Sequence, residues 1–491
     1  MDEQAQAESM TIAPVRPDLD VIADRLHRAE RELSAVGGEM AFGIVVRNGP
    51  GHAEAKLTNP YRPFRIASMT KSFTAAVMGS LENGGLNYDY PMYFLVPDLK
   101  GTAVGELTAR ECLTMGTGFG RDDPWADRME SMSRFDFLTF LQSPLVPIAH
   151  PGTGFEYCNL GYALLGLAAE SVTDRTFPEM VTTEVTGPLQ MPRTGFDVAD
   201  FPDLVPGLRI DRLGRAHRLT PTRPGAFSAI GGMVSTAHDI CQWMTIHMDA
   251  LDAEANTAPG AWSHVLAANQ RPHRPIAVET SRLHTEEVHY GYGLMHRQDS
   301  RFGRVLCHSG GYPGYGSHMR WFPDLGFGIV VLGNTTYYPA ERIVRDAVDA
   351  AWLTAIGRAE EIPRLRRDEP VTRASPVLER ETAPAPTHPL PPGPRTGRTV
   401  LGAVAATLNW DDAFADAHFA VNMDLDEPRQ ERRERTAAWL ESHRVDATRP
   451  VTVDDLTMET RLLGTVSVAE GAAITVRLDH LGDVQAITLS E

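Results

Sequence analysis

The chain has 491 residues, of which 42% are hydrophobic and 22% are charged. This composition is typical of a globular protein with a large core, and the length allows more than one domain. The formal net charge of −18 argues against a nucleic-acid partner, because proteins bind the phosphate backbone through clustered lysines and arginines.

Neither a membrane segment nor an export signal is predicted. The chain has no run of about eighteen apolar residues, and its acidic N-terminus lacks the basic and apolar regions of a secretory signal. The four cysteines are far apart and form no Cys-x-x-Cys pair, which predicts neither a zinc site nor a disulfide framework. We therefore expect a cytoplasmic protein with free thiols.

The predicted elements begin with a helix over residues 18–36, where apolar residues recur at helical spacing. A buried strand at 41–47 ends at a Gly-Pro turn, and a second short strand follows it. From about 86 to 225 the pattern is mostly helical, with long loops rich in glycine and proline. Three strands and a closing helix are then predicted at 303–308, 318–322, 326–334 and 340–357.

Strands on both sides of a helical block indicate one sheet that is assembled from the two ends of residues 1–365. We therefore predict an α+β fold, in which an antiparallel sheet is flanked by helices and carries an inserted helical subdomain at 86–225. A cleft between these two parts is the natural place for a ligand.

A linker and a small module complete the chain. Six prolines between residues 384 and 394 break any regular element, which predicts an extended linker at 366–396. Residues 397–491 are predicted to form a small α+β module. Its elements are a charged helix at 427–443 and strands at 457–466, 472–479 and 483–489.

Lysine is rare in this chain, and one of its three lysines follows a serine by three residues at the start of an apolar helical run. Ser68 and Lys71 are therefore neighbours on one face of the predicted helix. A serine hydroxyl needs a base to act as a nucleophile, and lysine, unlike arginine, can lose its proton when it is desolvated. The pattern alone is also compatible with a helix cap at Ser68 and a solvated Lys71.

Two later segments carry residues that suit the same chemistry. Tyr157 and Asn159 stand just before a predicted helix, where a phenol can relay protons and an amide can hold a substrate carbonyl. His308 closes an apolar strand, and we expect its charge to respond near neutral pH. Gly310 and Gly311 follow it, and glycine allows a substrate backbone to approach a strand edge closely.

Three short motifs of the penicillin-recognising serine hydrolases resemble segments of this chain, in the same order. The matching segments are Ser68-Met-Thr-Lys71, Tyr157-Cys-Asn159 and His308-Ser-Gly310. The family includes class C β-lactamases, D-alanyl-D-alanine carboxypeptidases, D-aminopeptidases and β-lactamase-like esterases, and the His-x-Gly form is closer to the last three. The resemblance covers residues 20–357, although Met115 stands where many relatives carry histidine.

The resemblance implies a role for each matched residue. Ser68 attacks a carbonyl and forms an acyl-enzyme, while Lys71 and Tyr157 share the duties of general base and general acid. His308 hydrogen-bonds near Tyr157 and assists proton transfer. Because the third motif has no lysine, a lowered pKa of Lys71 is expected to come from burial and from His308.

The same resemblance implies the substrate contacts. Asn159 holds the acyl side chain, and Gly310 lies at the strand edge that the substrate approaches. The backbone N–H groups of Ser68 and Gly311 form the oxyanion hole. No cofactor or metal is expected; in particular, His284 and His289 lack the spacing of a His-Glu-x-x-His zinc motif and are predicted to lie in a surface loop.

The leading interpretation is hydrolysis of a small ester or amide through an acyl-enzyme on Ser68. Two alternatives stay open. One is acyl or peptidyl transfer, including cleavage of D-residue peptides or macrocyclisation, and the other is a non-catalytic ligand-binding module with the same fold. The expected partner is a small ester, amide or peptide, with neither nucleic acid nor membrane, and a homodimer is left open.

Overall fold

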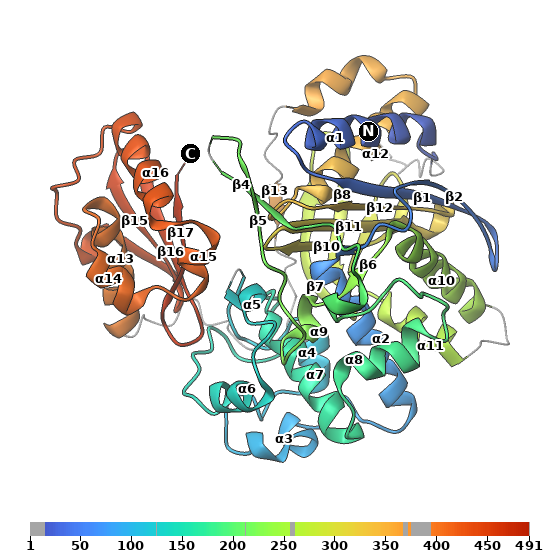
Figure 1. The fold of residues 1–491 in the computed structure, drawn as a ribbon, viewed down its shortest axis with the longest axis horizontal. Coiled ribbons are helices and arrows are strands. Elements are labelled where there is room, and N and C mark those ends of the chain that lie inside the picture. The colour runs from blue at the N-terminus through green and yellow to red at the C-terminus, as the bar shows by residue number, and fades with distance from the viewer. Residues whose placement is uncertain are drawn as a thin grey trace, which may run out of the picture.

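A nine-stranded antiparallel sheet is the centre of the larger part of the molecule (Figure 1). The computed structural model describes residues 15–123, 125–211, 213–255, 261–366, 372–374 and 394–490. The sheet joins strands from both ends of the first 374 residues, so the predicted α+β fold is confirmed. In sheet order the strands are β13 (Thr372–Ala374), β7 (Arg274–Thr280), β8 (Thr285–Tyr290), β9 (Met295–Asp299), β10 (Gly303–Tyr312), β11 (Tyr315–Phe322), β12 (Phe327–Gly333), β1 (Met40–Gly49) and β2 (His52–Thr58).

Helices cover both faces of this sheet. Successive residues of a strand point to opposite faces, and β12 buries Ile329 in one hydrophobic cluster and Val330 in another. Two helices from the ends of the larger part pack on the first face, and three pack on the second (Figure 1). These helices are α1 (Leu19–Ser34) and α12 (Ala340–Ala355), and then α2 (Thr70–Asn83), α10 (Ala237–Ala255) and α11 (Ala261–Asn269).

Aromatic packing fixes the helix that carries Lys71. Trp243 of α10 stacks on Phe73 of α2 with ring centroids 4.2 Å apart, and its indole N–H donates to Ser72 Oγ at 3.0 Å. The side chains of α2 are buried from Thr70 to Gly79. Stacking and a hydrogen bond together hold the first turns of α2 in one orientation.

The helical block predicted between the sheet strands consists of short helices that long loops connect. In chain order its helices are α3 (Met92–Leu95), α4 (Ala109–Leu113), α5 (Trp125–Arg128), α6 (Arg134–Leu141), α7 (Asn159–Thr173), α8 (Phe177–Met180) and α9 (Ser228–Gly231). Two strand pairs accompany them: β3 (Phe64–Arg65) with β6 (Val234–Ser235), and β4 (Leu208–Ile210) with β5 (Ala216–Arg218). None of the described helices is long and apolar enough to cross a membrane.

The C-terminal module has its own sheet and its own hydrophobic core (Figure 1). Val400 and Val404 of its first helix pack against Ile474 and Val476 of the sheet. Its helices are α13 (Pro394–Leu408), α14 (Asp412–His418), α15 (Asn422–Asp426) and α16 (Arg429–Ser442). Its strands, in sheet order, are β14 (Leu456–Thr460), β15 (Leu463–Ala469), β16 (Ala472–Leu478) and β17 (Val484–Leu489).

Several local predictions need correction. The strand predicted at 457–466 is two antiparallel strands, because the chain turns at Arg461 and Leu462. Within the segment predicted as a linker, residues 372–374 pair with β7 and Pro394 begins a helix; residues 367–371 and 375–393 lie outside the described residues. The segment predicted as a surface loop at 284–289 is mostly strand β8.

Candidate active site

Ser68 lies in a tight turn directly before α2. The turn is a single 3₁₀ segment, η1 (Ala67–Met69), and Ser68 is 7% exposed. Ala67 has a φ of +48°, a left-handed conformation that is uncommon for a residue with a side chain. Such a conformation persists only where the surroundings enforce it. Here Ser317 Oγ of β11 donates to Ile66 O at 2.7 Å and pins the turn to the sheet.

Lys71 is completely buried one turn along, and its Nζ points at Ser68. The ammonium donates to Ser68 Oγ at 2.9 Å and to Ile230 O at 2.7 Å. Burial lowers the pKa of Lys71 to about 8, although the nearby carboxylates of Asp123, Asp127 and Asp122 oppose this shift. A lysine with this pKa is neutral in part of the molecules near neutral pH and can accept a proton from the serine.

Tyr157 lies close to both Lys71 and Ser68, just before α7. Lys71 Nζ lies 5.1 Å from the centroid of the Tyr157 ring. Burial raises the pKa of Tyr157 well above its ordinary value, with Asp123 adding to the effect and a hydrogen bond with Ser68 opposing it. The phenol is therefore protonated near neutral pH, so the geometry presents a base at Lys71 and a proton donor at Tyr157.

A buried carboxylate holds the segment that carries Tyr157 and Asn159. Asp122 accepts hydrogen bonds from the backbone N–H of Asn159 at 2.7 Å and of Leu160 at 2.9 Å. These are free donors at the N-terminus of α7, where Cys158 supplies no side-chain cap. Asp122 thus caps α7 from a distant loop. Burial alone would raise the pKa of Asp122, but His480 and these N–H groups bring it below its ordinary value.

Asn159 is fully buried, and its amide faces the same carboxylates. Its Nδ2 donates to Asp122 at 3.0 Å and also to Asp123. Its Oδ1 has no hydrogen-bond partner among the described residues. In this structure Asn159 anchors the second motif, and its contact with a substrate stays a prediction.

The third motif brings His308 to the site in neutral form. His308 Nδ1 lies 2.6 Å from Ser309 O, and its Nε2 lies 3.2 Å from the hydroxyl of Tyr290. The bonding therefore assigns the proton to Nδ1, with Nε2 accepting from Tyr290. Burial, followed by the charge of Lys71, lowers the pKa of His308 to about 3. The prediction that His308 changes charge near neutral pH is therefore wrong.

Two further predictions about His308 receive only partial support. The His308 and Tyr157 rings lie 6.2 Å apart, but the hydrogen bond of His308 goes to Tyr290 rather than to Tyr157. Burial is the main cause of the lowered pKa of Lys71, as predicted, whereas His308 is not among the main contributors.

Gly310 and Gly311 allow β10 to lie against the Ser68 turn. A Cβ at Gly310 would approach Ile66 O to 2.4 Å and Ala67 Cβ to 2.9 Å. A Cβ at Gly311 would lie 2.5 Å from the ring of Tyr337. The contact with backbone at position 310 leaves room for glycine alone, so the spacing between the third motif and Ser68 depends on Gly310.

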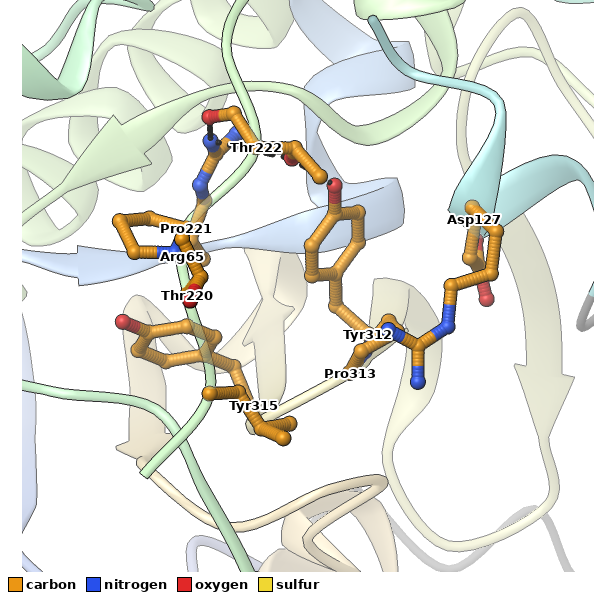
Figure 2. Close-up of a pocket in the computed structure, with 10 residues that line it drawn as sticks. Arg65, Asp127, Thr220, Pro221, Thr222, Tyr312, Pro313 and Tyr315 are labelled. Carbon is orange, nitrogen blue, oxygen red and sulfur yellow. Dashed lines mark hydrogen bonds between the residues drawn. The ribbon is translucent and has the colours of Figure 1, made fainter. Parts of the chain in front are cut away.

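A buried ion pair ties the neighbouring loop to the end of β10. Arg65 and Glu130 pair at 2.8 Å with side chains that are almost completely buried. The hydroxyls of Thr222 and Tyr312 both donate to the same carboxylate. Figure 2 shows Arg65, Thr222 and Tyr312 side by side along one wall of a narrow pocket, with Asp127 on another. The loop of Thr222 is thus anchored beside the third motif.

The C-terminal module forms one wall of a second cavity beside Tyr157. The Arg121 guanidinium lies 5.7 Å from the centroid of the Tyr157 ring. Arg121 and Asp123 face Thr475 and Arg477 of β16 across a cavity of about 220 Å³. A ligand that extends past Tyr157 in this direction would touch the C-terminal sheet.

A family model described as Beta-lactamase matches residues 28–352. The chain is a member of the beta-lactamase family. The resemblance to the penicillin-recognising serine hydrolases is therefore confirmed at the level of the family.

Individual relatives of this beta-lactamase family protein are distant. It is 25% identical over 299 residues to a beta-lactamase of Pseudomonas fluorescens. This match covers 57% of this chain and 81% of that protein. It is 23% identical over 287 residues to Protein flp of Staphylococcus aureus (strain NCTC 8325 / PS 47), which covers 56% of this chain. The match spans only about half of that relative, 53% of its length.

A solved structure shares the fold. The octameric penicillin-binding protein homologue from Pyrococcus abyssi superimposes with a TM-score of 0.56 at 20% identity. The superposition covers 69% of this chain and 78% of that chain. At this identity the likeness supports the fold, and any assembly of this beta-lactamase family protein stays a separate question.

The structure brings the predicted residues Ser68, Lys71, Tyr157 and His308 together and adds others that sequence patterns did not reveal. Asp127 lies in the short helix α5 and Glu130 just after it, where the sequence has no periodic pattern. Asp122 and His480 meet across 358 positions of sequence. The one local signal in the sequence is the pair of adjacent acidic residues at positions 122 and 123. Carboxylates are rarely buried without a partner, so burial of this pair points to partners elsewhere in the chain.

Proposed function

We propose that this protein cleaves a small ester or amide through an acyl-enzyme on Ser68. The observation that carries the proposal is the buried Lys71 Nζ, 2.9 Å from Ser68 Oγ and lowered in pKa. A buried lysine beside a serine hydroxyl, with a protonated phenol next to both, is the arrangement that nucleophilic catalysis requires.

The proposed acylation step transfers one proton away from the nucleophile and one proton to the leaving group. Neutral Lys71 takes the proton of Ser68 while Oγ forms a bond to the substrate carbonyl carbon. The N–H groups of Ser68 and Gly311 bind the oxyanion that develops on the carbonyl oxygen. Tyr157 then donates its proton to the departing alcohol or amine as the tetrahedral intermediate collapses, and Lys71 returns a proton to Tyr157.

The remaining predicted residues take supporting roles in this proposal. His308, neutral and hydrogen-bonded to Tyr290, orients the end of β10 and contributes no charge. Gly310 keeps β10 close to Ser68. Asn159 keeps Tyr157 in place through Asp122, and its Oδ1, which has no partner among the described residues, is free to bind the acyl side chain of a substrate.

A covalent serine probe tests the proposal. A fluorophosphonate should add its mass once, on a peptide that contains Ser68, and Ser68→Ala should abolish both labelling and turnover of p-nitrophenyl esters. Ser143→Ala, at a part-exposed position just after the end of α6, is the matched control and should behave as the wild type. Labelling at another serine, or turnover by Ser68→Ala, would contradict the assignment.

The acceptor of the acyl group decides between hydrolase and transferase. An amine added during turnover of a p-nitrophenyl ester should leave hydrolysis as the main reaction, with the free acid as product. Dominant formation of the amide would favour acyl or peptidyl transfer instead. The cytoplasmic location stays a prediction that cell fractionation tests.

A further inference from the structure

The turn between β16 and β17 of the C-terminal module enters the catalytic part of the molecule. Asp479 closes this turn by accepting the backbone N–H groups of Leu481, Gly482 and Asp483 at 2.9, 2.9 and 3.0 Å. The turn is therefore rigid, and His480 at its tip is only 1% exposed. A surface turn does not bury a histidine completely unless another part of the molecule receives it.

The receiving slot is aromatic on its sides and acidic at its end. The His480 ring meets the edges of Phe119 and Trp125, with centroids 5.6 and 6.1 Å apart. The backbone N–H of Val146 donates to His480 O at 3.2 Å. At the end of the slot, His480 Nε2 lies 3.3 Å from Oδ2 of Asp122.

Asp122 links this histidine to the second motif. Oδ2 of Asp122 also accepts the N–H of Leu160, while Oδ1 accepts the N–H and the amide of Asn159. A carboxylate without any exposed surface needs several donors, because its desolvation is expensive. His480 donates one of these hydrogen bonds, and it is the donor that comes from the C-terminal module.

We propose that His480 is a positioning residue of the active site, which holds Tyr157 in place through Asp122 and the first turn of α7. The C-terminal module is then a working part of the catalytic centre and not an appendage. This inference rests on the proposed function of Tyr157 as proton donor. Arg128 with Asp426 and Arg209 with Glu431 are partly solvated ion pairs between the two parts. Gln485 Nε2 donates to Arg121 O at 3.0 Å, but this bond holds the backbone beside Asp122 and not the carboxylate that caps α7.

Asp122, Cys158 and His480 also lie close enough together to suggest a metal site. The hydrogen-bond pattern favours the simpler arrangement. Both oxygens of Asp122 accept hydrogen bonds from backbone and amide donors. Cys158 Sγ lies 3.8 Å from Oδ2, a distance that suits a weak hydrogen bond from the thiol. Burial also raises the pKa of the Cys158 thiol well above its ordinary value, which opposes the thiolate that a metal would need.

Three substitutions separate positioning from simple packing. His480→Phe keeps an aromatic ring in the slot but removes the donor, and it should lower kcat for a short p-nitrophenyl ester by about 10- to 100-fold with KM within twofold. His480→Gln offers an amide N–H near the position of Nε2 and should recover much of this loss. His418→Phe is the matched control, because His418 contacts Phe414 within its own module.

A second measurement reads the position of the motif without catalysis. Hydrogen exchange of a peptide spanning residues 156–162 should accelerate in His480→Phe relative to the wild type and to His418→Phe, since the capped N–H groups lose their fixed acceptor. Unchanged exchange together with unchanged kcat would overturn the inference. Stoichiometric zinc in the purified protein would also overturn it, in favour of a metal site.

The two proposals fail in different ways. If Ser68→Ala abolishes turnover but His480→Phe equals the wild type, only the role of His480 is lost. If the wild type shows neither labelling nor turnover, the proposed function fails. The exchange measurement then still decides whether His480 holds the first turn of α7.

Discussion

Burial shifts the pKa values of two neighbouring side chains of the site in opposite directions. Burial disfavours the charged form of each group, so it lowers the pKa of Lys71 and raises that of Tyr157. Lys71 thereby becomes a better base and Tyr157 stays a proton donor. The order of proton transfer in the proposed mechanism follows from this contrast, which the motif alone could not assign.

The pH dependence of acylation should report Lys71. Because its pKa is lowered to about 8, the neutral base is scarce below that pH, and kcat/KM should rise with pH and level off above 8. His308, with its pKa lowered to about 3, should add no limb between pH 5 and 7. Initial rates with a short ester between pH 5 and 10 test this, and a flat profile would remove Lys71 as the base.

Lys71→Arg is the companion substitution for this profile. It keeps a cation of similar length, but arginine does not lose its proton in this range. The rate of acylation should therefore fall by about 10²- to 10⁴-fold, which is the usual contribution of a general base to the rate. The limb of the pH profile near pH 8 should also disappear. An active Lys71→Arg with an unchanged limb would assign that limb to another group.

Gly310→Ala should damage both stability and acylation. The added methyl group would meet Ile66 O at 2.4 Å, and a backbone atom cannot move aside as a flexible side chain can. We expect a loss of about 1–3 kcal/mol in the free energy of unfolding and a displaced Ser68 turn. Gly154→Ala, with open space around its Cβ position, is the control for denaturant unfolding and fluorophosphonate labelling.

At the scale of elements, the site depends on contacts between strands and loops that have no regular structure of their own. The Arg65–Glu130 pair connects β3 to the loop after α5, and Glu130 also accepts from Thr222 and Tyr312. A loop that supplies backbone groups to a buried network loses its freedom without forming a helix or strand. The network thus orders the surroundings of the third motif.

Glu130→Ala should therefore be strongly destabilising. It leaves the Arg65 guanidinium buried without its counter-charge, a situation that costs about 3–5 kcal/mol in the free energy of unfolding. Glu184→Ala removes the carboxylate of an exposed pair with Arg175 and should cost less than about 1 kcal/mol. Urea unfolding of both variants provides the comparison, and equal losses would show that burial of the Arg65 pair adds nothing.

At the scale of the whole molecule, sequence patterns predicted those elements whose burial appears as apolar residues. Strands β10 to β12 and helices α1 and α12 were found in this way, because their inward positions are apolar. Strands β7 to β9 were missed for the opposite reason. Arg297 of β9 is buried as an ion pair with Glu279 and Glu286, so these strands present charges where a strand pattern needs apolar residues.

The residues of the site also fall into those that a local sequence pattern predicts and those that it does not. Ser68, Lys71, Tyr157 and His308 were predictable because each belongs to a short motif with a chemical meaning. The contact between His480 and Asp122 has no local pattern, since it depends on how the C-terminal module docks. The charge state of His308 also depends on burial, which only the folded chain reveals.

The scarcity of lysine has a practical consequence for the chemistry of this protein. Lys71 is sealed inside the site, whereas Lys56 is exposed on β2 and Lys100 lies at the surface. Among the lysines of the described residues, amine-directed reagents such as succinimidyl dyes or activated resins will therefore reach only Lys56 and Lys100. The protein can be tethered or labelled in this way while the buried amine of Lys71 stays unmodified.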